Sequence, residues 1–243
     1  MAIAFASELV DSFSASAVAG TGSVTVSGAT SGRLLVAVLT IDGTAGGTPT
    51  DDTGNWTIRN NDSTTSSVVL ERIASGTSSD NFQVSWVSLR TWALTIAEYS
   101  GNAASPYLSS SFESFGVNGI VAQTTQAIPS AGAITPSTSP GMAVLTISNS
   151  DLRDYSTGEI SDNDGLFTES SFSTDTNSRG ACSFIFSYRF TTTAGIQPDV
   201  VNTPVQNYGG SFGVLLYEEA AAGGTWPHGP LGHPLHGTFG GPI

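Results

Sequence analysis

The hydrophobic and polar positions of this chain form short blocks of the kind that β-strands produce. The longest apolar stretch is residues 34–41, with a glycine at position 32 before it and Asp42 and Gly43 after it. A run of this length, rich in valine and isoleucine and bounded by turn residues, predicts a strand that is buried on both faces. We therefore expect residues 34–41 to lie at the centre of a sheet.

The central stretch has an echo later in the chain. Residues 37–41 and residues 143–147 both read Ala-Val-Leu-Thr-Ile. Residues 92–100 and 212–219 also resemble each other, and each segment closes one half of the chain. We interpret the chain as two pseudo-repeated halves, at about residues 20–101 and 130–219.

Further strands are expected where apolar and polar residues alternate. The expected segments are residues 9–17, 23–27, 56–58, 67–73, 82–86, 92–100, 120–128, 166–172, 182–190, 199–205 and 212–216. Residues 43–55 and 148–165 are polar and are expected to be loops. No window has a helical period, so the pattern predicts an all-β fold, a jelly-roll-like β-sandwich over residues 1–219.

Two arrangements of the halves are consistent with this pattern. Either both halves share a single core, or they form two small sandwiches in tandem. We favour the shared core, because neither half alone has a complete set of strong strands. A sandwich of about 100 residues is nevertheless feasible.

The last segment, residues 220–243, differs in kind from the rest. A flexible Ala/Gly joint is followed by apolar residues that glycine, proline and histidine separate, and the prolines exclude a helix. Such a segment cannot form its own core, so we interpret it as an extended arm that docks on another surface. The docking residues are predicted to be Trp226, Leu231, Leu235, Phe239 and Ile243.

The charge balance excludes some classes of partner. The net charge is −13, there is no lysine, and the seven arginines are scattered along the sequence. Nucleic-acid binding normally needs a concentrated basic patch, and so does docking on an anionic membrane. We expect neither partner.

Cys182 is the only cysteine, so the chain has no internal disulfide, and we expect this residue to be a small buried hydrophobe. The first residues lack the basic and apolar regions of a signal peptide, and no segment is long enough to span a bilayer. The pattern predicts synthesis in a cytoplasm.

Three candidate chemistries are outweighed by simpler interpretations, so we expect no catalytic, cofactor or metal residues. Gly209 to Gly213 match G-x-S-x-G around Ser211, but the motif leads into a strand where a hydrolase needs a helix. His228, His233 and His236 all lie in the arm, with no acid or cysteine beside them. The loop acids lack the spacing of a calcium loop; they are Asp51, Asp52, Asp151, Asp154, Asp162 and Asp164.

Aromatic side chains leave a rival function open. Trp56 begins a strand after a turn and is a candidate for stacking against a sugar, whereas Trp86 and Trp92 are expected in the core. A carbohydrate-binding module that uses loop aromatics is therefore the alternative from another class.

Several motifs together resemble a sandwich domain that recurs in phage virion proteins and bacterial surface proteins. They are the Gly-led apolar strand at residues 32–41, the turn at residues 52–56, the closing segment at residues 97–101, and a second Gly-led strand at residues 141–147. The resemblance covers about residues 20–219. It implies a jelly-roll-like module for attachment or display, with no catalytic residues to carry over.

We therefore expect a non-enzymatic structural protein of a phage particle. A capsid decoration or cement protein is the first expectation, and a tail or fibre component is the second. The protein would be made in the host cytoplasm and reside in the virion. Its expected partners are other virion proteins and copies of itself, with a host-surface glycan as an additional candidate.

Overall fold

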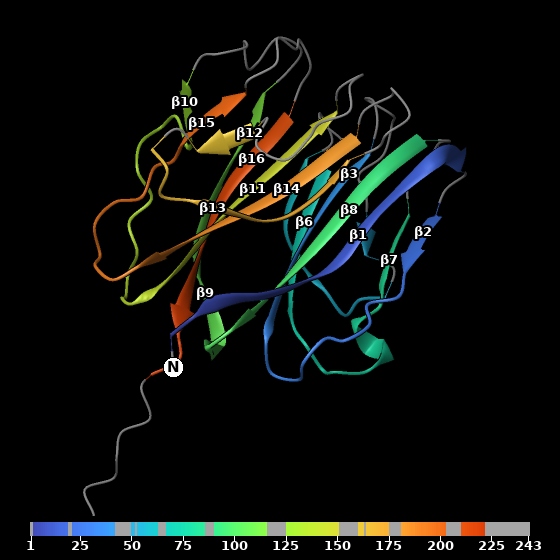
Figure 1. Ribbon diagram of the computed structural model, residues 1–243, viewed down its shortest axis with the longest axis horizontal. Coiled ribbons are helices and arrows are strands. Elements are labelled where there is room, and N and C mark those ends of the chain that lie inside the picture. Colours follow the sequence, from blue (N-terminus) through green and yellow to red (C-terminus); the bar gives the residue numbers. More distant parts are fainter. Residues whose placement is uncertain are drawn as a thin grey trace, which may run out of the picture.

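The computed structural model describes residues 2–18, 21–41, 50–51, 53–62, 67–85, 90–115, 125–150, 160–162, 164–174, 181–202 and 210–221. Within these ranges the regular structure consists of strands and one 3₁₀ helix, η1 (Ser78–Asp80). The expected all-β class is confirmed, and two five-stranded antiparallel sheets form a β-sandwich (Figure 1).

The first half of the molecule, residues 2–101, contains one large and one small sheet. The large sheet has the order β1-β8-β3-β6-β5 and the small sheet the order β2-β7-β4, with every pair antiparallel. The strands are β1 (Ala4–Val18), β2 (Thr21–Val24), β3 (Leu34–Ile41), β4 (Thr50–Asp51), β5 (Thr57–Asp62), β6 (Ser67–Ile73), β7 (Phe82–Ser85) and β8 (Arg90–Ser100).

The second half, residues 102–221, also contains one large and one small sheet. Their orders are β13-β14-β11-β16-β9 and β10-β15-β12. The strands are β9 (Asn102–Phe115), β10 (Thr125–Ala127), β11 (Gly141–Ser150), β12 (Ile160–Asp162), β13 (Thr168–Thr174), β14 (Ala181–Phe190), β15 (Asp199–Asn202) and β16 (Gly210–Glu219). If the strands of the second half are numbered from β9 as the first, its large sheet has the same neighbours as that of the first half. In both halves the order across the large sheet is first, eighth, third, sixth and fifth strand.

The strand registers agree with the sequence echo. In the first half Ile41 pairs with Trp92, and in the second half Ile147 pairs with Phe212. Ile41 and Ile147 are the last residues of the two Ala-Val-Leu-Thr-Ile segments, and Trp92 and Phe212 are the first residues of the two similar closing segments. The central strand of each half therefore meets its closing strand in the same register.

Hydrophobic residues form three clusters in successive layers. One lies within the first half, around Leu39, Leu70 and Phe82, and another lies within the second half, around Leu145 and Phe184. A third cluster contains residues of both large sheets and lies between them, where the sheets face each other (Figure 1). Each half thus has a core of its own and shares a further one, so neither of the two expected arrangements describes the packing by itself.

Burial on two sides accounts for the apolar central strands. All eight residues of β3 are buried, and alternate residues belong to different clusters. The same division holds for β11, where Leu145 faces the second-half core and Val144 faces the other large sheet. The prediction of a strand buried on both faces is confirmed.

Three segments form strands that the sequence analysis did not expect. The expected pattern has no strand between residues 101 and 120, yet β9 occupies Asn102–Phe115. It is an edge strand with many serines, a proline and shifts of register opposite Leu216 and Tyr217, so its apolar signal is weak. Similarly, β4 and β12 form inside the expected polar loops at residues 43–55 and 148–165, because two or three residues suffice to pair with β7 and β15.

We predict that Gly101→Ala destabilises the protein by about 2 kcal/mol or more. Gly101 makes the turn between the halves with φ of 76°, and an added Cβ would overlap the backbone of Ala2. The matched control is Gly28→Ala, where φ is 82° but nothing lies within 4 Å of the added atom. Urea unfolding of both variants checks this, and equal losses of stability would contradict the predicted backbone overlap.

Candidate functional site

The junction between the large sheets has one side that is built from small hydroxyl residues. The Ser183 side chain on β14 donates to the Ala93 carbonyl oxygen over 3.0 Å and lies 2.8 Å from the Thr40 hydroxyl oxygen. The hydroxyl groups of Thr95 and Ser171 form a second hydrogen bond between the halves. Thr40, Ala93, Thr95, Ser171 and Ser183 are all buried. The serine and threonine hydroxyl groups here therefore join the two halves and do not cover the surface.

The opposite side of the junction, where β5 lies against β9, contains larger and charged groups. The Asn60 amide donates to the Ser211 hydroxyl oxygen over 3.0 Å, and Ser114 donates to the Asp62 carboxylate. Arg59 forms an ion pair with Glu71 and places its guanidinium 3.5 Å from the centroid of the Tyr107 ring. Arg59, Glu71 and Tyr107 border a recess of about 370 Å³, which Ile73 and Ser105 also line.

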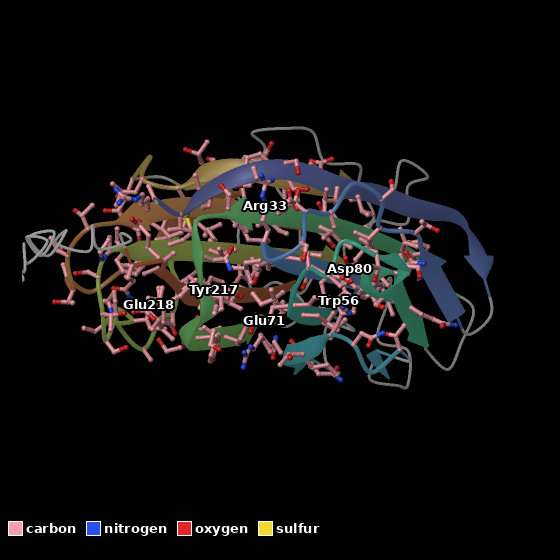
Figure 2. All side chains as sticks on the ribbon, turned by 90° about the horizontal axis from the view of Figure 1, so that it is seen from below. Arg33, Trp56, Glu71, Asp80, Tyr217 and Glu218 are labelled. Atoms are coloured by element: carbon pink, nitrogen blue, oxygen red, sulfur yellow. The ribbon has the colours of Figure 1, made fainter. Side chains whose placement is uncertain are left out.

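The electrostatics of this side stabilise fixed protonation states. Burial by itself lowers the pKa of Arg59, but the hydrogen bond and charge of Glu71 outweigh it, and the net pKa is raised. Burial, together with the nearby Glu71 carboxylate, raises the pKa of Tyr217 well above its ordinary value; Figure 2 labels both residues. Near neutral pH Arg59 therefore stays charged and Tyr217 stays neutral, so neither is suited to proton transfer.

Asp80 organises the loop between β6 and β7. Its carboxylate lies 2.7 Å from Arg72 and accepts hydrogen bonds from the backbone N–H groups of Ser75 and Gly76, at 2.9 and 2.8 Å. Burial by itself would raise the pKa of Asp80, but these hydrogen bonds and the Arg72 charge lower it overall. The carboxylate is therefore a structural anchor that stays ionised.

Four of the seven arginines form ion pairs among the described residues, and each partner lies in the same half of the molecule. These pairs are Arg33–Glu98, Arg59–Glu71, Arg72–Asp80 and Arg189–Glu219. The paired arginines therefore do not combine into the basic patch that a polyanion would need.

The second half has a recess of about 350 Å³ beside the loop at residues 191–198. Its wall contains the rings of Phe167 and Tyr188, whose centroids are 5.5 Å apart, together with the exposed Leu166 and Asp164. The first half has a recess of about 290 Å³ in the corresponding loops, lined by small and polar residues such as Thr77 and Asn81. The sequence analysis identified the aromatic face of residues 182–190 but not this recess.

The predicted docking residues Trp226, Leu231, Leu235, Phe239 and Ile243 lie outside the described residues, as do the three histidines. The described chain ends at Ala221. Just before it, the backbone N–H of Ala220 donates to the Gly101 carbonyl oxygen over 2.7 Å. The arm therefore leaves the body next to the start of β1, and Figure 1 shows the N-terminus beside the end of β16.

Ser211 lies inside β16 and is buried, with an exposed fraction of 4%. Its hydroxyl accepts the hydrogen bond of Asn60, and its backbone pairs with Ser148 on one side and Ser114 on the other. A residue in the middle of a sheet does not have the exposed strand-to-helix turn of a nucleophile elbow.

Trp56 is not a sugar-stacking platform. Its exposed fraction is 5%, and its ring packs edge-on against Phe82 with centroids 5.6 Å apart. Trp92 is buried as expected, Trp86 lies outside the described residues, and Cys182 is buried as expected. The half-buried aromatic side chains that line recesses are instead Tyr107 and Tyr188.

Among the described residues, no group of three or more His, Cys, Asp or Glu is placed to hold an ion. Asp164 is exposed on a turn, whereas Asp52, Asp151 and Asp154 lie outside the described residues and the side chains of Asp51 and Asp162 are not described. The described part of the chain contains no helix with the length and apolar character needed to cross a membrane.

Comparison of the chain with protein-family models, with curated proteins and with solved structures finds no match. Its function must therefore be inferred from the arrangement of its own residues.

We predict that Ser183→Ala lowers the free energy of unfolding by about 1–2 kcal/mol, because it removes hydrogen bonds that join the halves in a buried setting. Ser27→Ala, at an exposed position, is the control and should change stability by less than about 0.5 kcal/mol. Urea unfolding of both variants measures the difference. Equal stability of the two variants would show that the buried hydroxyls do not hold the junction.

We predict that Asp80→Asn destabilises the protein by about 2 kcal/mol at pH 7. The pKa of Asp80 is lowered from its ordinary value of 3.8, so its contribution to stability is present above that pH and is lost as the pH falls through the lower folded-state value. The difference between wild type and variant should therefore shrink in acid. Unfolding curves at pH 7 and pH 3 measure it, and a constant difference would contradict the assignment.

Proposed function

We propose first that the chain contains two jelly-roll-like units. A jelly roll pairs its first strand with its eighth, its second with its seventh and its third with its sixth, and both halves contain these three pairings. The turns at Gly54 and Gly165 both have positive φ, and each is followed two residues later by a buried aromatic residue, Trp56 and Phe167. The two halves share their strand order, the pairing register of their central strands and the glycine turn before a buried aromatic residue, and this supports a pseudo-repeat of one unit.

The packing between the halves also supports a repeat. Strand β1 lies against β13, and β5 lies against β9. When strands are numbered within each half, the first strand of one half contacts the fifth strand of the other, and the reverse contact is also present. The isologous interface of a symmetric dimer has the same reciprocal contacts. We infer that the two units pack as the subunits of such a dimer would.

We propose that this protein is a non-enzymatic structural component of a phage particle, and specifically a capsid decoration or cement protein. The observation that carries the proposal is the face-to-face pair of eight-stranded units, because jelly rolls are recurrent building blocks of viral shells. The buried Ser211 and the structural use of the arginines support a non-enzymatic role. A tail or fibre component is the second candidate of the same kind.

The proposed attachment device is the C-terminal arm, residues 220–243. The arm leaves the body beside Gly101, at the end of the molecule where β9 and β16 meet. Residues 222–243 contain no Asp, Glu, Arg or Lys, whereas the whole chain has a net charge of −13. An uncharged apolar segment on an acidic body can bury its side chains on a neighbouring copy or on another virion protein without bringing like charges together.

We predict that deletion of residues 223–243 leaves the fold intact but abolishes incorporation into particles, because the body has its own cores whereas the arm supplies the contact. Particles from a complementation experiment would be purified and their content of the protein quantified. Circular dichroism and thermal unfolding of the isolated variant would report on the fold.

The control for this experiment keeps the length of the arm. Replacing Trp226 and Phe239 by serine should reduce incorporation as strongly as the deletion, whereas replacing Thr225 and Thr238 by serine should not. Normal incorporation of the truncated protein would overturn the anchoring role. Exclusion of the truncated protein together with normal incorporation of the Trp226 and Phe239 variant would assign the contact to other residues of the arm.

A further inference from the structure

The recess beside the loop at residues 191–198 is called here the second-half recess. It has a volume of about 350 Å³, which is within the range of about 300–1,000 Å³ for small-molecule sites. Turn residues Asp164 and Leu166, strand residue Tyr188 and loop residue Gln197 come together around it. It combines an aromatic wall with a few polar groups, as small-molecule sites commonly do.

In the first half a buried leucine occupies the position that corresponds to Tyr188. Tyr188 pairs with Ala143 on the central strand, and the residue in the same register in the first half is Leu70, which pairs with Ala37. Leu70 is fully buried in a core cluster that also contains Trp56 and Phe82. The two halves have thus diverged at this one place: a closed hydrophobic core in the first half corresponds to a partly open ring in the second.

The second-half recess is shaped by fixed groups. The loop at residues 191–198 is held by backbone hydrogen bonds between Ile134 and Ile196, at 2.9 and 3.0 Å. The Gln197 amide nitrogen donates to the Pro129 carbonyl oxygen over 2.6 Å. The half-buried Tyr188 side chain packs against Phe167 and the second-half core and also lines the recess.

The chemistry of the wall selects the class of ligand. A pyranose ring has an apolar face of C–H groups that stacks on an aromatic side chain, and an edge of hydroxyl groups that donate and accept hydrogen bonds. Tyr188 and Leu166 supply the apolar surface, while the exposed Asp164 carboxylate accepts hydrogen bonds from hydroxyl donors.

The charge of the recess narrows the class of ligand further. Asp164 is the one charged side chain among the residues that line the recess. An anionic ligand would be repelled by it, and a purely apolar side chain of a peptide would bury the carboxylate without a partner, which costs free energy. A neutral molecule that has both an apolar face and hydroxyl donors meets both conditions.

We propose that the second-half recess binds a neutral saccharide through one pyranose ring, which stacks on Tyr188 and donates hydroxyl hydrogen bonds to Asp164. The proposal is independent of the virion role, because it rests on the recess and not on the arm. In a particle protein it would supply contact with surface glycans; in any other setting it would still make this half a lectin-like unit.

The test uses the full-length protein on an array of neutral and uronic-acid oligosaccharides, followed by calorimetry with the neutral oligosaccharide that gives the strongest signal. Tyr188→Ala should weaken binding at least tenfold, and Asp164→Asn should also weaken it. Tyr188→Phe keeps the ring and should bind like the wild type. Ser78→Ala, in the corresponding recess of the first half, is the matched control and should leave binding unchanged.

Each outcome decides the proposal. Loss of binding in Tyr188→Ala with retention in Tyr188→Phe supports it when thermal unfolding shows that both variants are folded at the assay temperature, because the ring also packs against Phe167 and the core. The proposal is overturned by binding to no neutral glycan, by preference for the uronic-acid oligosaccharides, or by undiminished binding in Tyr188→Ala and Asp164→Asn.

Discussion

The structure depends on one constraint: each large sheet is apolar on both faces and must be covered on both. The small sheet of the same half covers one face, and the large sheet of the other half covers the second, so the three clusters succeed one another in layers. At about 25 cal/mol per Å² of apolar area, exposing the middle layer would remove a large part of the driving force for folding. The central strand β3, with all eight residues buried, is the clearest consequence of that requirement.

The shared layer is not purely apolar, and its polar groups determine how the halves fit together. Hydrogen bonds of Ser183 and Thr40 require one lateral position of the sheets, whereas apolar contacts tolerate sliding. On the opposite side the Arg59–Glu71 pair stays inside the first half and meets the second through the Tyr107 ring. Apolar burial therefore supplies the attraction, and the hydroxyl and aromatic contacts supply the register.

The sequence predicted those features that a local pattern encodes. The apolar run at residues 34–41, its echo at residues 143–147 and the alternation at residues 182–190 all correspond to inner strands of the large sheets, because burial constrains all or most positions there. The edge strand β9 was missed, since a strand with one free edge can carry serine and Pro106. The second-half recess was also missed, because it brings together Asp164, Tyr188 and Gln197 from separate segments, and no local pattern encodes their proximity.

The proposed repetition of one unit would allow the two halves to differ locally. A unit that folds around its own core can lose packing at one position if the layer between the halves is retained, because that layer holds both units in place. The first half uses its β6–β7 loop for structure, with Asp80 ionised and Trp56 buried against Phe82. The second half has no such anchor among the described residues of its corresponding loop at 191–198, and there Tyr188 remains partly open. In the proposed saccharide-binding protein, the first half would contribute the more tightly held loop and the second half the binding recess, while both halves form the layer between them.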